Sequence, residues 1–208
     1  MIEYASDPVR VGNVIIGGGN PIVVQTMCNT HTSDVGASFK QCMRLFQAGA
    51  QMIRLTVPSM AQVAHISEIR RRLREAGCDV PIVADVHFSS DIAIAVASEV
   101  DKVRINPGNF SKNFETAQFR FAELVRVCKT YGTAIRIGVN HGSLGERITE
   151  LYGNTAEGMK EAAMEWLRMC RENDFHNVVV SLKASNTCVM VEAYRLLVVA
   201  MIAEDMHY

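Results

Sequence analysis

Four strand-like segments of the sequence each place one cation among apolar residues. The segments are residues 52–55 with Arg54, 103–105 with Arg104, 135–137 with Arg136, and 181–183 with Lys183. Side chains alternate between the two faces of a strand, so each cation lies on the face opposite its apolar neighbours. Arginine and lysine are seldom buried without a partner. If the apolar neighbours pack against helices, the four cations point into one shared interior.

Four converging cations repel one another unless an anion of matching charge binds between them. The planar guanidinium of arginine can donate two parallel hydrogen bonds to a phosphate group, and such charge-assisted bonds are about twice as strong as neutral ones. We therefore predict a phosphorylated or diphosphorylated substrate. The alternative is that each cation pairs with an acid at a strand end or extends its charged group into solvent.

Asp85 and His87 form a second candidate group, on the strand-like segment 81–87 between the first two arginine segments. Residues two apart in a strand share a face, so both side chains are expected to point into the same interior. A carboxylate and an imidazole there can orient a substrate hydroxyl or move a proton, and we predict a catalytic role for both. Two ligands are too few for a zinc site. In the alternative interpretation, Asp85 is the counter-ion of Arg54 or Arg104.

Polar turn residues follow the second and third arginine segments. Asn106 and Asn109 enclose a Pro-Gly pair, and Asn140 and Ser143 enclose a His-Gly pair. Turns of this kind expose backbone N–H groups and polar side chains. We predict that these four residues contribute to substrate binding, as a ring of amides and hydroxyls above the cations.

Strand-like and helix-like segments alternate along the chain. Two apolar runs, residues 9–14 and 22–27, surround the glycine-rich stretch 17–21 and predict a hairpin that leads into the first barrel strand. Further strands are predicted at residues 51–57, 81–87, 101–106, 133–140 and 177–183, and helices at about 32–48, 59–77, 91–98, 113–131, 159–170 and 188–203. The Thr-Ser-Asp stretch at 32–34 can cap the first helix, and Ser59 the second. A long loop is expected at residues 141–154.

This alternation predicts an α/β fold with a parallel sheet and right-handed crossovers. The sheet could close as a TIM-type (β/α)8 barrel or remain a doubly wound open sheet. The barrel is favoured because polar residues recur at the C-terminal ends of nearly every strand, whereas an open sheet concentrates its site at one switch point. A barrel needs eight strand–helix units, and about six are present. We therefore expect residues 1–208 to be one substrate-binding barrel domain, truncated and incomplete at its C-terminus.

The composition is that of an ordinary globular domain, with 49% hydrophobic and 21% charged residues. A formal charge of −1 with interspersed signs argues against a nucleic-acid partner. We find no signal peptide and no apolar stretch of membrane-spanning length, and we expect a cytoplasmic protein. The six cysteines form no C-x-x-C pair, so we expect reduced thiols that pack as small hydrophobes and bind no metal.

Six motifs resemble, in their order, the barrel domain of the 4-hydroxy-3-methylbut-2-enyl diphosphate synthase family. They are VQTMCNTHTSD, MIRLTV, VADVHF, DKVRINPGNF, AIRIGVNHGSL and VVSLKASN. The resemblance covers essentially all of the chain from Val9 onward, and RINPGN after a DVHF strand is highly specific. The stretches NHGSL-x-ERI and DFHNVVVSLKASN are most similar to the long form of the family, which carries an extra domain between the barrel and the cluster domain.

The resemblance implies an oxidoreductase of the non-mevalonate isoprenoid pathway. Family members open the ring of 2-C-methyl-D-erythritol 2,4-cyclodiphosphate, using a [4Fe–4S] cluster and electrons from ferredoxin or flavodoxin. The barrel holds the diphosphate, and a C-terminal domain of the partner subunit covers it with the cluster, which implies a homodimer. Carried over by motif, the diphosphate ligands are Arg54, Arg104, Arg136 and Lys183, with Asn140 and Ser143 nearby, while Asp85 and His87 face the erythritol portion.

Two features depart from the family pattern. Cys28 and His31 stand where the family often has Thr or Ser and an acid, so no role is assigned to them. The family's cluster cysteines have paired spacing in a C-terminal domain that this sequence does not contain, so we expect no bound cluster and no activity from the chain alone. Two alternatives stay open: a pterin- or phosphosugar-binding barrel synthase, and a non-catalytic fragment that self-associates through open sheet edges.

Overall fold

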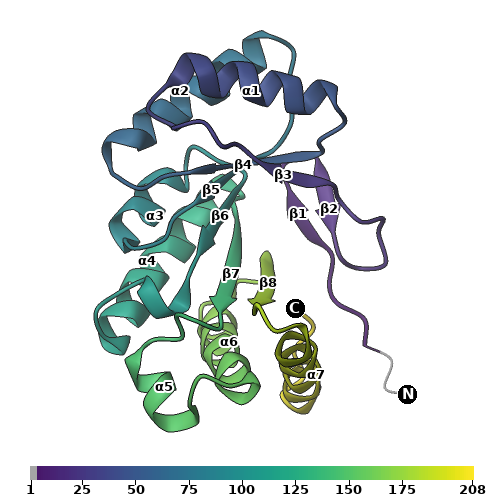
Figure 1. The fold of residues 1–208 in the computed structure, drawn as a ribbon, viewed down its shortest axis with the longest axis vertical. Helices are drawn as coiled ribbons and strands as arrows, with labels where there is room; N and C mark the ends of the chain where they lie inside the picture. Colours follow the sequence, from purple (N-terminus) through teal and green to yellow (C-terminus); the bar gives the residue numbers. More distant parts are fainter. Residues whose placement is uncertain (1–3) are drawn as a thin grey trace.

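The computed structural model describes residues 4–208 and contains two sheets and a series of helices (Figure 1). The strands are β1 (Val9–Val11), β2 (Val14–Ile16), β3 (Gln25–Met27), β4 (Met52–Thr56), β5 (Ile82–Asp85), β6 (Lys102–Ile105), β7 (Ala134–Asn140) and β8 (Val178–Lys183). The helices are α1 (Val35–Gln47), α2 (Ala61–Glu75), α3 (Ser90–Val96), the 3₁₀ turn η1 (Pro107–Asn109), α4 (Phe114–Tyr131), α5 (Glu146–Tyr152), α6 (Ala156–Glu172) and α7 (Thr187–Ala203).

The main sheet has six parallel strands in the order β3-β4-β5-β6-β7-β8, which is also their order in the chain. A doubly wound sheet reverses its strand order at a switch point, and this sheet does not. The strands instead curve into a half-barrel with helices on the outer side and the β1–β2 pair on the inner side (Figure 1). The TIM-type fold predicted from the sequence is therefore confirmed.

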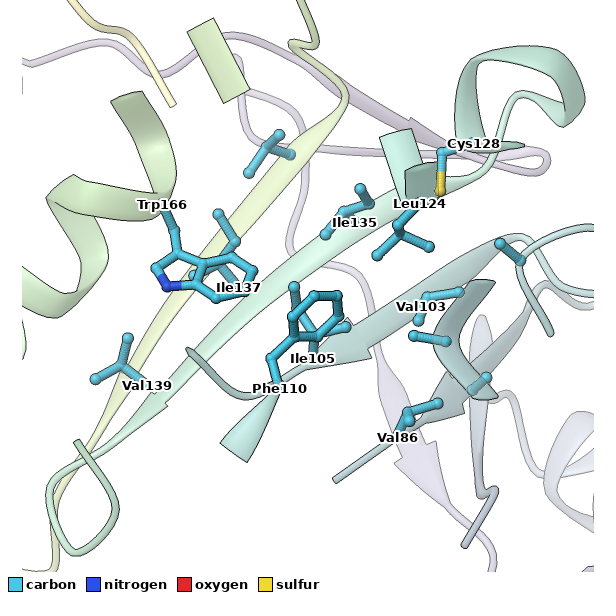
Figure 2. Close-up of a cluster of buried hydrophobic side chains, with 14 of the residues drawn as sticks. Val86, Val103, Ile105, Phe110, Leu124, Cys128, Ile135, Ile137, Val139 and Trp166 are labelled. Carbon is cyan, nitrogen blue, oxygen red and sulfur yellow. The ribbon is translucent and has the colours of Figure 1, made fainter. Parts of the chain in front are cut away.

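The apolar residues of the strands fix which face of the sheet is inside the barrel. On β6 and β7, Val103, Ile105 and Ile137 pack outward against helices α4 and α6 (Figure 2). The Phe110 ring meets the Trp166 ring edge-on, with centroids 5.0 Å apart and planes at 86°. Such aromatic pairs add about 0.5–1.5 kcal/mol beyond the area they bury. Because alternate residues face outward, the residues between them face the barrel interior.

A hairpin closes the inner side at the N-terminal ends of the strands. Val9 and Val11 of β1 pack against Met52, Val83 and Ala134, which form a second, smaller apolar cluster. The hairpin itself is confirmed, but its predicted turn at residues 17–21 is wrong. β1 pairs with β2 so that Val11 faces Val14, and the turn lies at residues 12–13, where Gly12 has φ +57°. The run 22–27 supplies β3 of the main sheet instead.

The predicted helix starts and the predicted loop were only partly correct. Asp34 caps α1, because its Oδ1 accepts a hydrogen bond from Ala37 N at 2.8 Å. Ser59 does not cap α2; the cap position is Met60, whose side chain makes no capping bond. The predicted loop 141–154 contains helix α5, which has only seven residues and a glycine at each end. A helix of two turns shows too little apolar periodicity to be predicted.

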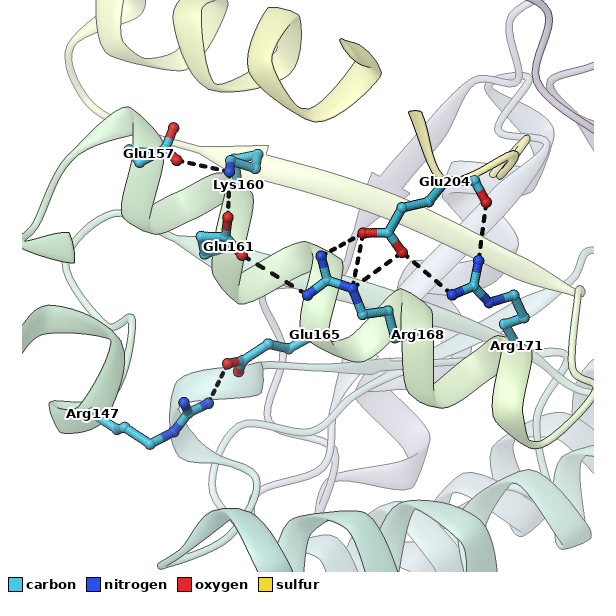
Figure 3. Close-up of polar contacts among 8 residues, drawn as sticks. All are labelled: Arg147, Glu157, Lys160, Glu161, Glu165, Arg168, Arg171 and Glu204. Carbon is cyan, nitrogen blue, oxygen red and sulfur yellow. Dashed lines mark hydrogen bonds and ion pairs between the residues drawn. The ribbon is translucent and has the colours of Figure 1, made fainter. Parts of the chain in front are cut away.

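An ionic network joins α6 to the end of α7 (Figure 3). Arg168 Nε donates to Glu204 Oε1 at 3.0 Å, and Arg171 Nη1 donates to the Glu204 backbone oxygen at 3.0 Å. On the other side of α6, Glu165 pairs with Arg147 of α5. These contacts fix the last helix and the short helix α5 to the same central helix.

Candidate anion-binding site

The strand register sets the charged residues of the interior in two rows. In the upper row, nearer the C-terminal ends of the strands, Asp85 lies beside Arg104 and Arg104 beside Arg136. In the row below, Val83 lies between Arg54 and Lys102. The three predicted strand arginines therefore do share one interior face, together with a lysine that the sequence analysis did not select.

Asp85 lies at the centre of this group and is 2% exposed. Its Oδ1 accepts from Arg104 Nη1 at 3.3 Å, and its Oδ2 lies 3.5 Å from Arg54 Nε. His87 Nε2 lies 3.6 Å from the same Oδ2. Asp85 is thus the counter-ion of both arginines, as the alternative interpretation stated. A catalytic role for Asp85 and His87 stays a prediction.

Some of the other arginine donors have neutral partners. Arg54 Nη2 lies 3.0 Å from Met27 Sδ, and Arg136 Nε donates to Ser181 Oγ at 2.9 Å. Burial lowers the pKa of Arg104, an effect that Asp85 opposes and Arg54 reinforces. Burial also lowers the pKa of Arg136, and Arg54 and Arg104 add to the effect. Arginine nevertheless stays charged in proteins. The arginine side chains therefore repel one another and are partly removed from water.

Lys102, the residue that the sequence analysis missed, is 1% exposed. Its Nζ donates to Gln25 Oε1 at 3.3 Å. The available signal was strand alternation, because Lys102 precedes Arg104 by two residues and must share its face. Ser181 could have been found in the same way, two residues before Lys183.

The predicted rim residues divide into two groups. Asn106 Nδ2 donates to Ser143 Oγ at 3.0 Å, so the loops after β6 and β7 are joined above the arginine row. Asn140 and Lys183 are register partners at the ends of β7 and β8, and Lys183 is exposed. Asn109 is different, because it lines a hollow with Phe88 and Lys112 rather than the barrel interior. A contribution of Asn109 to substrate binding stays a prediction.

The cysteines of this chain do not fit an iron–sulfur cluster, which needs converging thiolates. No three His, Cys, Asp or Glu side chains within residues 4–208 gather as metal ligands. Burial raises the pKa of Cys128 to about 12, so that residue is a thiol at neutral pH. Cys28 and Cys42 do contact each other, with their sulfurs 3.5 Å apart, but no further thiol or imidazole completes a ligand set in the described residues.

None of the helices described for residues 4–208 combines the length and the apolar character needed to cross a membrane.

The curved parallel sheet and its cation-lined interior define a TIM-type barrel domain with a candidate anion-binding site. The family model described as the GcpE TIM-barrel domain matches residues 6–207. The chain belongs to this family, which confirms the resemblance seen in its motifs.

Curated relatives carry the name of one enzyme. The chain is 46% identical to the 4-hydroxy-3-methylbut-2-en-1-yl diphosphate synthase (flavodoxin) of Parabacteroides distasonis, over 98% of this chain and 36% of the relative. It is 45% identical to the 4-hydroxy-3-methylbut-2-en-1-yl diphosphate synthase (ferredoxin) of Synechococcus sp. (strain CC9605), over 96% of this chain and 55% of the relative. The chain therefore spans between about a third and just over half of the length of these relatives.

Solved structures of other enzymes share the fold. A truncated 3-deoxy-D-arabino-heptulosonate 7-phosphate synthase from Thermotoga maritima superposes with a TM-score of 0.58 at 13% identity, over 93% of this chain and 65% of that one. The dihydropteroate synthase of Xanthomonas albilineans gives a TM-score of 0.58 at 13% identity, over 96% of this chain and 71% of that one. At such identity the likeness shows the TIM-like fold alone.

Proposed function

We propose that this chain is the substrate-binding barrel of a 4-hydroxy-3-methylbut-2-en-1-yl diphosphate synthase. Its interior binds the diphosphate of the cyclic substrate 2-C-methyl-D-erythritol 2,4-cyclodiphosphate. The observation that carries the proposal is the charge balance of the interior. Arg54, Lys102, Arg104 and Arg136 line it, and in the described residues their only ion-pair partner is Asp85.

A bound diphosphate would supply the negative charge that this interior lacks. Arg104 is held by Asp85 and by the Gly138 carbonyl oxygen, and Arg136 by Ser181 through Nε. Guanidinium groups fixed in this manner lose little side-chain entropy when they donate to phosphate oxygens. We propose that Arg54, Arg104, Arg136 and Lys183 contact the diphosphate, with Asn106, Asn140 and Ser143 at the rim.

Asp85 and His87 are proposed to face the erythritol part of the substrate. The Asp85 carboxylate lies 3.6 Å from His87 Nε2, and the His87 side chain is 41% exposed. An imidazole oriented by a carboxylate can donate to a substrate hydroxyl or move its proton.

The redox step is proposed to belong to parts of the longer enzyme. There a [4Fe–4S] cluster supplies the electrons for opening the ring, and the relatives' names indicate flavodoxin or ferredoxin as the donor. We further propose a cytoplasmic homodimer in which the partner subunit covers the barrel mouth. The chain alone is expected to bind the diphosphate without turning the substrate over.

Isothermal titration calorimetry with pyrophosphate tests the binding step. Arg136→Ala removes one charge-assisted contact, worth about 1.5–3 kcal/mol, so binding should weaken about tenfold to a hundredfold. Arg126→Ala removes an exposed arginine of α4 and should bind like the wild type. A folded wild-type sample, checked by circular dichroism, that binds no pyrophosphate would refute the proposal.

Self-association is a second candidate, favoured by the sheet edges. β3 and β8 end the six-stranded sheet, and each has one edge without a strand partner in the described residues. Open edges offer N–H and C=O groups to a second chain. Light scattering should then report a dimer or a larger species, and a monomer at all concentrations would exclude this candidate.

A further inference from the structure

Lys102 reaches across the interior of the half-barrel. It stands on β6, while its hydrogen-bond partner Gln25 stands on β3, and two strands separate β6 from β3 in the sheet. The hydrogen bond between the two side chains, with Nζ and Oε1 3.3 Å apart, therefore crosses the concave side of the sheet. At the level of the backbone, Lys102 lies one row below Arg104, between its register partners Val83 on β5 and Ala134 on β7, which belong to the smaller apolar cluster.

No carboxylate of the described residues lies within ion-pair distance of Lys102. The charged groups on and beside the strands around it are Arg54 on β4, Asp85 at the end of β5 with His87 just after it, Arg104 on its own strand, Arg136 on β7, and Lys183 at the end of β8. Asp85 is already engaged by two arginines. The hairpin contributes the buried Val9 and Val11 to this region, and the charged residue between them, Arg10, is exposed.

A lysine in such surroundings loses part of its proton affinity. Burial, followed by repulsion from Arg136 and Arg54, lowers the pKa of Lys102 to about 7. When Lys102 is neutral, its amine can still donate a hydrogen bond to Gln25 Oε1, because an amine donates to an amide oxygen as an ammonium does.

We propose that Lys102 adjusts the charge of the anion site: at about pH 8 it is largely neutral when the interior is empty, and it takes up a proton when a dianion binds among Arg54, Arg104 and Arg136. This inference rests on the proposed function, because it requires an anion in the interior.

The physical reason is reciprocal coupling between proton and anion. A nearby negative charge favours the ammonium form, so the anion raises the proton affinity of Lys102. By linkage, the proton then raises the affinity of the anion by the same factor. Below about pH 7 the lysine is already charged and pH has little effect. Above it, each bound anion must bring a proton with it, and affinity falls as pH rises, by at most about tenfold per unit.

The experiment is calorimetric titration of the chain at pH 8 in two buffers with different heats of ionisation. The probes are sulfate and a P1,P2-diester of pyrophosphate, because neither has a proton equilibrium near this pH, whereas phosphate monoesters titrate near pH 6. The difference in binding heat between the buffers gives the protons taken up, and close to one proton per bound anion is expected.

Two lysine variants isolate the group. Lys102→Met replaces the amine with an apolar side chain and should abolish the proton uptake and flatten the dependence of affinity on pH. Lys40→Met changes an exposed lysine of α1 and should keep the wild-type uptake. If Lys102→Met does not fold, NMR of the Lys102 side-chain 13Cε in the wild type replaces it, and its titration midpoint should rise when sulfate is added.

The outcomes separate this inference from the proposed function. Anion binding with no proton uptake, with equal uptake in Lys102→Met, or with an unmoved NMR midpoint overturns the role of Lys102 and leaves anion binding intact. A folded wild-type chain that binds neither probe overturns both.

Discussion

The guanidinium of Arg104 lies across the backbone of Gly138. Arg104 Nη2 donates to the Gly138 carbonyl oxygen at 3.0 Å, and a Cβ at position 138 would lie only 2.5 Å from Arg104 Nε. The residue is not among the glycines with positive φ, so glycine is required here for space and not for backbone conformation. One small residue on β7 thus determines where the arginine of β6 can lie.

Gly138→Ala should displace Arg104 from the anion site while leaving the fold intact. The added methyl group would force the guanidinium to move and would weaken both of its contacts, to Gly138 and to Asp85. We expect pyrophosphate binding to weaken about tenfold or more, which corresponds to about 1.4 kcal/mol. Calorimetry measures the affinity, and circular dichroism checks the fold.

Gly142→Ala is the matched control, because a Cβ there meets nothing within 4 Å. It should bind pyrophosphate like the wild type. Equal affinities for Gly138→Ala and the wild type would show that the position of Arg104 is not constrained by this glycine.

Asp85→Asn should make the anion-free chain less stable, and a bound anion should stabilise the variant more than it stabilises the wild type. The substitution removes the carboxylate that pairs with Arg54 and Arg104, and breaking a buried pair costs about 3–5 kcal/mol. A bound anion would then compensate a larger charge imbalance. Thermal unfolding should show a lower midpoint than the wild type, and pyrophosphate should raise that midpoint by more degrees. Glu150→Gln, at an exposed position without an ion-pair partner in the described residues, should change neither quantity appreciably. An equal rise in all three proteins would contradict the argument.

The orientation of the arginines could be predicted from sequence because strand alternation has a fixed period of two residues. Arg104 and Arg136 stand between apolar residues that pack outward, and the structure places both inside. Lys102 follows the same rule. It comes directly after Asp101, however, and two adjacent charged residues are typical of the exposed start of a strand. Its burial depends on the hairpin and on Gln25, which are distant in sequence.

The errors also have physical causes. The turn of the hairpin was assigned to the glycine-rich stretch 17–21, although the two residues Gly12 and Asn13 suffice to reverse the chain. Asn109 follows Arg104 closely in the sequence, and its place at the rim stays a prediction. The 3₁₀ turn η1 ends at this residue, which lines the hollow beside Phe88.

Glu204→Gln should weaken the attachment of α7 to α6. The hydrogen bonds from Arg168 lower the pKa of Glu204, and burial opposes them. The pair is partly exposed, so the expected loss is about 0.5–1 kcal/mol, and it should shrink at high salt. Because the folded pKa is depressed, the contribution is complete above the unfolded value of about 4.3 and is lost as pH falls through the folded pKa.

Urea unfolding at pH 7 and at about pH 4 measures this effect. The difference between Glu204→Gln and the wild type should be present at pH 7 and should decrease as the carboxyl group becomes protonated. Glu172→Gln, at an exposed position near the end of α6, should show no such difference. A pH-independent difference would indicate that Glu204 acts through packing.

Lys102 should make the empty chain more stable as pH rises from about 7 to 8. Burial lowers the folded pKa of Lys102 to about 7, while the unfolded lysine titrates near 10.4. In this interval the unfolded chain therefore binds more protons than the folded one, and stability rises by at most about 1.4 kcal/mol per pH unit. Above about pH 8.5 the cysteines ionise in the unfolded chain while burial keeps Cys128 and Cys170 protonated in the folded one, so the trend should then be opposed. Urea unfolding in an anion-free buffer measures the increase. Lys102→Met should reduce it and Lys40→Met should retain it, whereas an equal pH dependence in all three proteins would mean that Lys102 is charged throughout, with no proton left for an anion to recruit.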